Sequence, residues 1–126
     1  LFLTSCAMDV LVVSSQPSFL AEGLKALTEK GIVSHVQRTV EEALAAFQAL
    51  SPSLVILDAE SASGDLAGTC QALHDISRAP VILVTVEELS AIEAAACFEA
   101  RAGARLLRSA SPILLLAWAQ ALTRRL

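Results

Sequence analysis

Runs of consecutive aliphatic residues recur along the chain and alternate with segments of helical period. Because the runs lack polar alternation, they predict strands that are buried on both faces of a parallel sheet. The predicted strands, three of them clear and two shorter, lie at residues 10–13, 32–37, 54–57, 81–84 and 106–107. Pro52 and Pro80 lead into the third and fourth strands, and Asp58 and Thr85 follow these strands directly.

Helix signals fill the intervals between these strands. Pro17 and Ser111–Pro112 predict helix starts, since proline suits the first helical turn, and Gly31 predicts a helix end. Thr39–Glu42 and Ser90–Glu93 have the pattern of a capping box, in which a hydroxyl and a carboxylate satisfy free backbone donors. The alternation of strands and helices predicts right-handed βαβ units, and therefore an α/β fold with a doubly wound, five-stranded parallel sheet.

Composition limits the class of protein. The 126 residues give room for one domain with its own core. A net charge of −4 opposes direct contact with nucleic-acid phosphates. A hydrophobic share of 55% against 17% charged residues excludes disorder and predicts apolar surface that meets a partner. The longest apolar run, Ile113–Ala119, is far shorter than the roughly 20 residues that cross a bilayer, so no membrane span is expected.

Cysteine usage and the N-terminus bear on location. Cys6, Cys70 and Cys97 are odd in number, widely spaced and without a C-x-x-C pattern, which favours reduced thiols in the cytoplasm over disulfides or a zinc site. Residues 1–7 lack the basic residue and the apolar stretch of a secretory signal. Since the only methionine directly follows them, we expect these residues to be a leader or a cloning remnant and residues 8–126 to form the domain.

The residues directly after the strands are candidate site residues, because ligands of a doubly wound sheet bind beyond the carboxyl ends of its strands. They are Ser14, Ser15, Asp58, Thr85 and Arg108. Nucleophilic chemistry at the serines is not expected, because His35 and His74 fall in the second strand and the third helix, away from this edge, and no base is evident.

Three segments carry a resemblance to the receiver domains of bacterial response regulators. Residues 12–24 are similar to the family's V-D-D-H-P-L-F-R-E-G-L, a wording typical of the NarL/LuxR subgroup. Gly103–Ala104 is similar to its G-A pair, and Leu106–Pro112 to its L-L-K-D-A-S-P, with a gap before Leu106 where the family tyrosine is lost. The resemblance covers residues 8–126 and implies a flavodoxin-like, CheY-like three-layer (βα)5 fold.

The resemblance assigns roles to the candidate site residues. Asp58 falls at the family's phosphoacceptor, Thr85 at its hydroxyl residue and Arg108 at its lysine. In the family, two acidic residues after the first strand hold Mg²⁺ with the phosphoacceptor, but here both are serine, Ser14 and Ser15. Without the cation nothing neutralises a transferring phosphoryl group, so we expect no bound metal, no cofactor and a poor phosphoacceptor.

Other departures from the family agree with this expectation. Ala62 stands where the family has proline, and Val86 where it keeps a small side chain beside the phosphoryl group. We expect the remnant of the site to be an ion pair between Asp58 and Arg108, formed directly or through Thr85 or water. Such a cluster would hold the domain in one fixed state.

Two other functions stay open. Asp58–Ala59–Glu60 resembles the h-h-h-h-D-x-D of phosphatases with an aspartate nucleophile at the end of a buried strand, although Glu60 is one methylene longer than aspartate. An emptied pocket at the switch point of the sheet would instead suit a small-molecule sensor. Turnover of a phosphate ester would favour the enzyme, and ligand-dependent thermal stabilisation would favour the sensor.

The last helix indicates how the domain acts. Ile113, Leu114 and Ala117 stand where the family carries charged residues, while other residues of the helix already supply the core face. Surplus apolar residues on an exposed face predict an interface, for a second copy or for an output domain, joined by the preceding helix around Ala94 and Phe98.

The sequence therefore predicts a receiver-like, phosphorylation-independent signalling domain without catalytic residues, the regulatory part of a transcription regulator in the bacterial cytoplasm. The expected partners are a second copy as a homodimer, a DNA-binding output domain in the same protein, and a histidine kinase. Neither nucleic-acid contact by this domain nor a membrane association is expected.

Overall fold

The computed structural model describes residues 8–47, 49–62, 65–87, 89–100 and 102–123. Residues 1–7, predicted above as a leader, lie outside the described residues. The strands are β1 (Asp9–Val13), β2 (Val33–Gln37), β3 (Leu54–Asp58), β4 (Val81–Thr85) and β5 (Ala102–Leu107). They form one parallel sheet in the order β2-β1-β3-β4-β5, so the order reverses between β1 and β3. The predicted doubly wound α/β sheet is confirmed.

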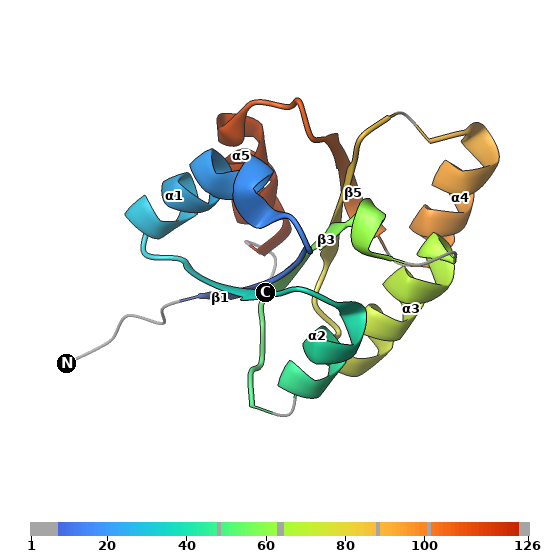
Figure 1. Ribbon diagram of the computed structural model, residues 1–126, viewed down its shortest axis with the longest axis horizontal. Coiled ribbons are helices and arrows are strands. Elements are labelled where there is room, and N and C mark those ends of the chain that lie inside the picture. The colour runs from blue at the N-terminus through green and yellow to red at the C-terminus, as the bar shows by residue number, and fades with distance from the viewer. Residues whose placement is uncertain (1–7, 48, 63–64, 88, 101, 124–126) are drawn as a thin grey trace.

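Helices cover both faces of this sheet. They are α1 (Ala21–Glu29), α2 (Val40–Ala46), α3 (Leu66–Ser77), α4 (Ala91–Glu99) and α5 (Pro112–Thr123), with short 3-10 helices η1 (Pro17–Leu20) and η2 (Ala59–Ser61). α1 and α5 lie together on one face, and α2, α3 and α4 cover the other (Figure 1). Among the described helices, none is long and apolar enough to span a membrane.

The central strands divide their side chains between two cores. Val10, Val12 and Ile56 pack toward α1 and α5, whereas Leu11 and Leu57 pack toward α2, α3 and α4. All five are fully buried, which explains why these strands show no polar alternation. The central strands β1 and β3 are therefore packed against helices on both faces of the sheet.

The fifth strand is longer than the sequence predicted. It begins at Ala102 rather than Leu106, because an edge strand is buried on alternate residues only and Gly103 and Arg105 occupy its less buried positions. The aliphatic-run criterion therefore detected only Leu106 and Leu107. A register irregularity at the start of the β4–β5 pairing accompanies this sequence.

The predicted helix ends are mostly confirmed. Pro17 does begin helical structure, but as the 3-10 turn η1 before α1. Gly31, which follows the C-cap residue Lys30 of α1, has a φ of 80°, a conformation that favours glycine. The hydroxyls of Thr39 and Ser90 accept the backbone N–H groups three residues on, as expected. The carboxylate of Glu42 accepts the N–H of Arg38 instead of closing the box on Thr39.

Candidate functional site

The sheet register brings four of the predicted site residues to one edge. Asp58 is the last residue of β3 and lies beside β4, which ends at Thr85. Ser14 directly follows β1, the other neighbour of β3. Arg108 follows β5, and its backbone N–H donates to the carbonyl of Thr85 at 2.8 Å. The strand-end rule therefore predicted correctly that these residues lie together at one edge of the sheet.

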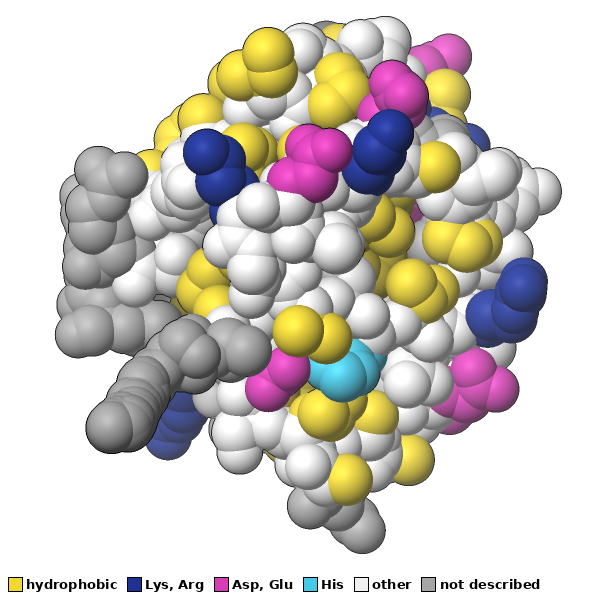
Figure 2. All heavy atoms as spheres, turned by 90° about the vertical axis from the view of Figure 1, so that its left-hand side faces the viewer, with side chains coloured by type: hydrophobic (Ala, Val, Ile, Leu, Met, Phe, Trp, Pro, Cys, Tyr) yellow, Lys and Arg dark blue, Asp and Glu magenta, His cyan; other side chains and the backbone are white. Residues whose placement is uncertain are grey.

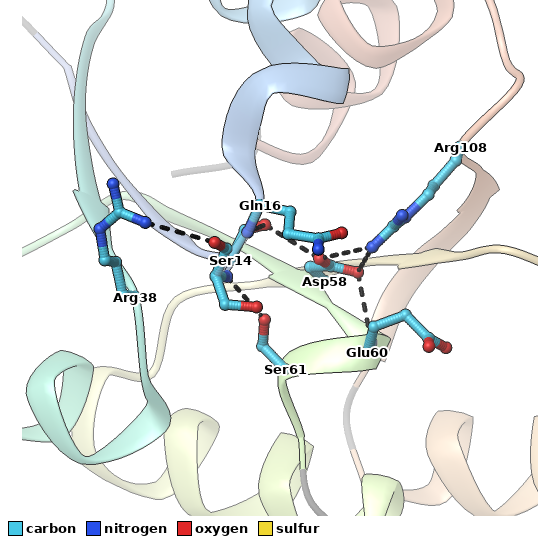
Figure 3. Close-up of polar contacts among 8 residues, drawn as sticks. Ser14, Gln16, Arg38, Asp58, Glu60, Ser61 and Arg108 are labelled. Atoms are coloured by element: carbon cyan, nitrogen blue, oxygen red, sulfur yellow. Dashed lines mark hydrogen bonds and ion pairs between the residues drawn. The ribbon is translucent and has the colours of Figure 1, made fainter.

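The Asp58 carboxylate is fully buried and surrounded by hydrogen-bond donors (Figure 3). The Ser14 hydroxyl donates to its Oδ2 at 2.9 Å, and the Glu60 backbone N–H to its Oδ1 at 3.2 Å. Nη2 of Arg108 contacts both oxygens, at 3.1 Å and 2.9 Å. The predicted ion pair is thus confirmed, and it forms directly.

These contacts determine what Asp58 can do chemically. A carboxylate offers about four lone-pair positions, and three donor atoms engage both oxygens of Asp58: the Ser14 hydroxyl, the Glu60 N–H, and Nη2 of Arg108, which contacts the two oxygens together. The guanidinium supplies the counter-charge that a buried carboxylate requires. A nucleophilic attack by Asp58 would have to break this shell first, so the geometry favours a structural anion over a reactive one.

Thr85 does not take part in the ion pair. Its side chain is 2% exposed, and Oγ1 has no hydrogen-bond partner among the described residues. Its contribution to the cluster is the carbonyl that accepts the N–H of Arg108. Of the routes considered for the pairing, the bridge through Thr85 is therefore wrong.

Three further residues, none of which was predicted as a site residue, complete the site. Gln16 donates its N–H to the Ser14 hydroxyl at 3.1 Å, and Ser61 accepts the N–H of Ser15 at 2.9 Å. Arg38 directs Nη1 to the Ser15 carbonyl at 3.3 Å. Arg38 is the first residue after β2, so applying the strand-end rule to the second strand would have found it. The other two depend on loop conformation and left no sequence signal.

The residues present do not suit the magnesium ion of a receiver site. Among the described residues, no group of three or more His, Cys, Asp or Glu side chains could hold a metal. Asp58, the one carboxylate at the strand end, is already neutralised by Arg108. Mg²⁺ needs anionic oxygen ligands in near-octahedral geometry, and neutral Ser14 and exposed Ser15 do not supply them.

The alternative of an aspartate-nucleophile enzyme gains no support from this geometry. The side chain of Glu60 points away from Asp58 (Figure 3), so the two do not form a carboxylate pair. His35 contacts Asp9 at 3.0 Å, between β2 and β1, and His74 lies within α3. Neither histidine reaches the candidate site.

Comparison with known proteins supplies the class of fold. No protein-family model matches the chain, and no curated protein matches its sequence. A two-component response regulator from Clostridium difficile superposes with a TM-score of 0.83 at 19% identity, covering 94% of this chain and 97% of that one. The orphan response regulator HP1043 of H. pylori gives 0.82 at 19% identity, with 96% and 100% covered. The signal receiver domain of NarL from Mycobacterium tuberculosis gives 0.78 at 18%, with 93% and 96% covered.

The fold is therefore the CheY-like receiver fold of response regulators, with the flavodoxin-like (βα)5 arrangement. At identities of 18% to 19% this likeness defines the architecture alone. What the chain does with that architecture depends on the candidate site and on the surface of the domain.

Proposed function

We propose that this chain is a phosphorylation-independent signalling domain without enzymatic activity, which acts through protein–protein contact. It would serve as the regulatory domain of a bacterial transcription regulator in the cytoplasm, of the NarL/LuxR type that residues 12–24 resemble. The fold shared with two-component response regulators supports a role in signalling. A DNA-binding output domain and a histidine kinase are the partners that such a role implies.

The closed shell around Asp58 is the observation that carries this proposal. Ser14 and Arg108 occupy its carboxylate oxygens, and the described part of the chain has no group of three or more His, Cys, Asp or Glu side chains that could hold Mg²⁺. In this proposal, Arg108 permanently neutralises the charge of Asp58, which phosphorylation would otherwise change. The domain is thereby held in one electrostatic state, and regulation passes to whatever binds its surface.

A phosphodonor assay tests this proposal. The protein is incubated with acetyl phosphate and Mg²⁺, and its intact mass is then measured. The mass should stay unchanged, because Arg108 already neutralises Asp58 and because Ser14 and Ser15 stand where Mg²⁺ would need carboxylate ligands. A stoichiometric increase by one phosphoryl group that disappears in Asp58→Asn would overturn phosphorylation independence.

A rebuilt site provides the positive control for that assay. The triple variant Ser14→Asp, Ser15→Asp, Arg108→Lys restores the two acidic residues and the lysine that the resemblance implies. Circular dichroism first verifies that this variant folds. Labelling of the variant alone would show that the serines and the arginine are what prevents phosphorylation, whereas equal labelling of both proteins would contradict the proposal.

The contact surface that we propose is α5, with a second copy as the partner. Its twelve residues carry no charge. Ile113 is 75% exposed and Leu114 42%, and Ala117 is exposed between them and Trp118. The exposure of these apolar side chains supports the proposal that they form a contact surface. Phe98 on α4, 51% exposed, extends the apolar area expected at this interface.

A further inference from the structure

An open cavity lies on the α1 side of the carboxyl edge of the sheet. Its volume is about 780 Å³, within the range of roughly 300 to 1,000 Å³ typical of small-molecule sites. The loop after β1, the first turns of η1 and α1, and two arginines line it, and it opens widely to solvent. The lining residues are Ser15, Gln16, Pro17, Ser18, Ala21, Leu24, Arg38 and Arg108.

The charge of this lining differs from that of the chain. The protein carries a net charge of −4, yet the described residues that line the cavity include two arginines and no acidic side chain. The Glu42 carboxylate accepts the backbone N–H of Arg38 but is not part of this lining. A second cavity at the same edge, on the far side of Asp58, is lined by Glu60, Glu87 and Glu93. On the face drawn in Figure 2, by contrast, acidic and basic side chains are interspersed. The carboxyl edge is therefore divided by sign, and the α1 side is its positive half.

Contacts with the loop and with Asp58 fix the two arginines at the cavity. Arg38 extends from the end of β2 to the Ser15 carbonyl, at 3.3 Å, and is otherwise exposed. Arg108 is held by Asp58, so this pair adds little net charge. The pairing also removes the repulsion that an unneutralised Asp58 would exert on an anion. The excess positive charge at the cavity comes from Arg38.

The remaining lining residues offer both polar and apolar contacts. The hydroxyls of Ser15 and Ser18 lie at exposed positions of the lining, and the Gln16 side chain points toward the Asp58–Arg108 pair (Figure 3). Pro17, Ala21 and Leu24 form an apolar wall along η1 and α1. A ligand that suits this cavity carries an oxyanion at one end and an apolar group at the other.

We propose that this cavity binds a small organic phosphate reversibly and without a metal ion. The Arg38 guanidinium forms charge-assisted hydrogen bonds to the phosphate, the serine hydroxyls and Gln16 add neutral ones, and the apolar wall accommodates the organic group. No bond to protein is made or broken. Binding at this place is independent of whether α5 forms a dimer, and it leaves the protein mass unchanged, so it is distinguishable from phosphorylation of Asp58.

Titration calorimetry with phenyl phosphate tests the site, with inorganic phosphate as the probe of the oxyanion alone. Phenyl phosphate should bind more tightly than inorganic phosphate, because the apolar wall adds contacts. Arg38→Gln should weaken phenyl phosphate binding roughly tenfold, the loss expected for one charge-assisted contact. Benzylamine, of similar size but cationic, should not bind.

Two control variants distinguish a built site from general electrostatics. Arg78→Gln removes the same charge from an exposed position at the C-terminus of α3 and should leave the affinity unchanged. Thr85→Val alters the family's hydroxyl position, outside this cavity, and should also retain binding. Equal losses in Arg38→Gln and Arg78→Gln, binding abolished by Thr85→Val alone, binding of benzylamine, or no heat with phenyl phosphate would each overturn the proposal.

Discussion

Asp58 is a charged residue that is fully buried at the end of the central strand β3. A carboxylate at 0% exposure is costly to bury unless its charge and its lone pairs are satisfied. Arg108, Ser14 and the backbone of Glu60 satisfy them, and all three residues lie just beyond the ends of β5, β1 and β3. The ion pair is therefore a structural element whose loss should affect stability as well as signalling.

The first prediction concerns this ion pair. Asp58→Ala and Arg108→Ala should each lower the free energy of unfolding by about 1 to 3 kcal/mol, because each leaves the other charge partly buried and unpaired. The double variant should lose less than the sum of the two. Urea unfolding of the four proteins gives the coupling energy, and strictly additive losses would show that the pair is energetically unimportant.

The second prediction concerns the thiols of Cys70 and Cys97, which are free and buried in the core between the sheet and α3 and α4. Burial, together with the smaller effect of the neighbouring Cys97, raises the pKa of Cys70 from 9.0 to about 12, and burial also raises the pKa of Cys97. Above pH 9 the unfolded chain loses the thiol protons that the folded protein retains. The stability contributed by the neutral thiols is therefore complete below pH 9 and declines as the pH rises toward 12.

Urea unfolding across the alkaline range measures this effect. The free energy of unfolding should fall by up to roughly 1.4 kcal/mol per pH unit for one such thiol. The chain contains no tyrosine, so no phenol hydroxyl titrates in the same pH range. Cys70→Ala should show a shallower decline, and an identical slope in both proteins would refute the assignment to Cys70.

At the scale of elements, the C-terminus of α3 contains an unfavourable backbone conformation. Arg78 follows α3 with a φ of 61°, in the left-handed region, and its N–H donates to the His74 carbonyl at 2.8 Å. Glycine is the usual residue at such a helix end, because a Cβ is unfavourable there. The conformation serves to direct the chain from α3 into β4.

The third prediction follows from this helix end. Arg78→Gly should raise the free energy of unfolding by about 0.5 to 1 kcal/mol, the relief of strain exceeding the added flexibility of the unfolded chain. Thermal and urea unfolding measure it. Arg78→Ala is the matched control, since it removes the guanidinium and keeps the Cβ. A gain of the same size in Arg78→Ala would assign the effect to charge instead.

At the scale of the whole molecule, α5 exposes apolar side chains that the core of a single copy does not use. The opposite side of the helix packs into the core through Leu115 and Ala119, and α5 lies against α1. Ile113, Leu114 and Trp118 remain exposed to solvent. Burying one isoleucine and one leucine side chain contributes about 1.5 to 3 kcal/mol each before association costs, so the dimer that we propose is weak.

The fourth prediction tests that dimer. Sedimentation equilibrium at micromolar concentrations should show association of the wild type, and Leu114→Glu should shift it to monomer, because two-fold symmetry places both new charges near the axis. Ala49→Glu adds the same charge at an exposed site beyond α2 and should leave association unchanged. A monomeric wild type, or a dimer that Leu114→Glu does not affect, would remove α5 as the self-association surface.

The parts of the fold that could be predicted are those in which one local pattern has one structural meaning. Strands β1, β3 and β4 were predicted closely because burial on both faces requires an unbroken aliphatic run. Most of β5 was missed because an edge strand admits glycine and arginine at its exposed positions. Asp58 and Arg108 could be placed at one edge because parallel strands end together, and their pairing was expected from the roles that the resemblance implies.

The sequence by itself determined the alternation of elements, the strand-end identity of the site residues and the surplus of apolar residues in α5. Tertiary structure alone decided that Arg108 contacts Asp58 directly, that Thr85 contributes its carbonyl rather than its hydroxyl, and that Arg38 joins the same edge. The physical reason is the separation along the chain of the residues that interact. Hydrophobic periodicity is a local property of the chain, whereas these contacts join strand ends and loops far apart in sequence, whose geometry exists only once the sheet has formed.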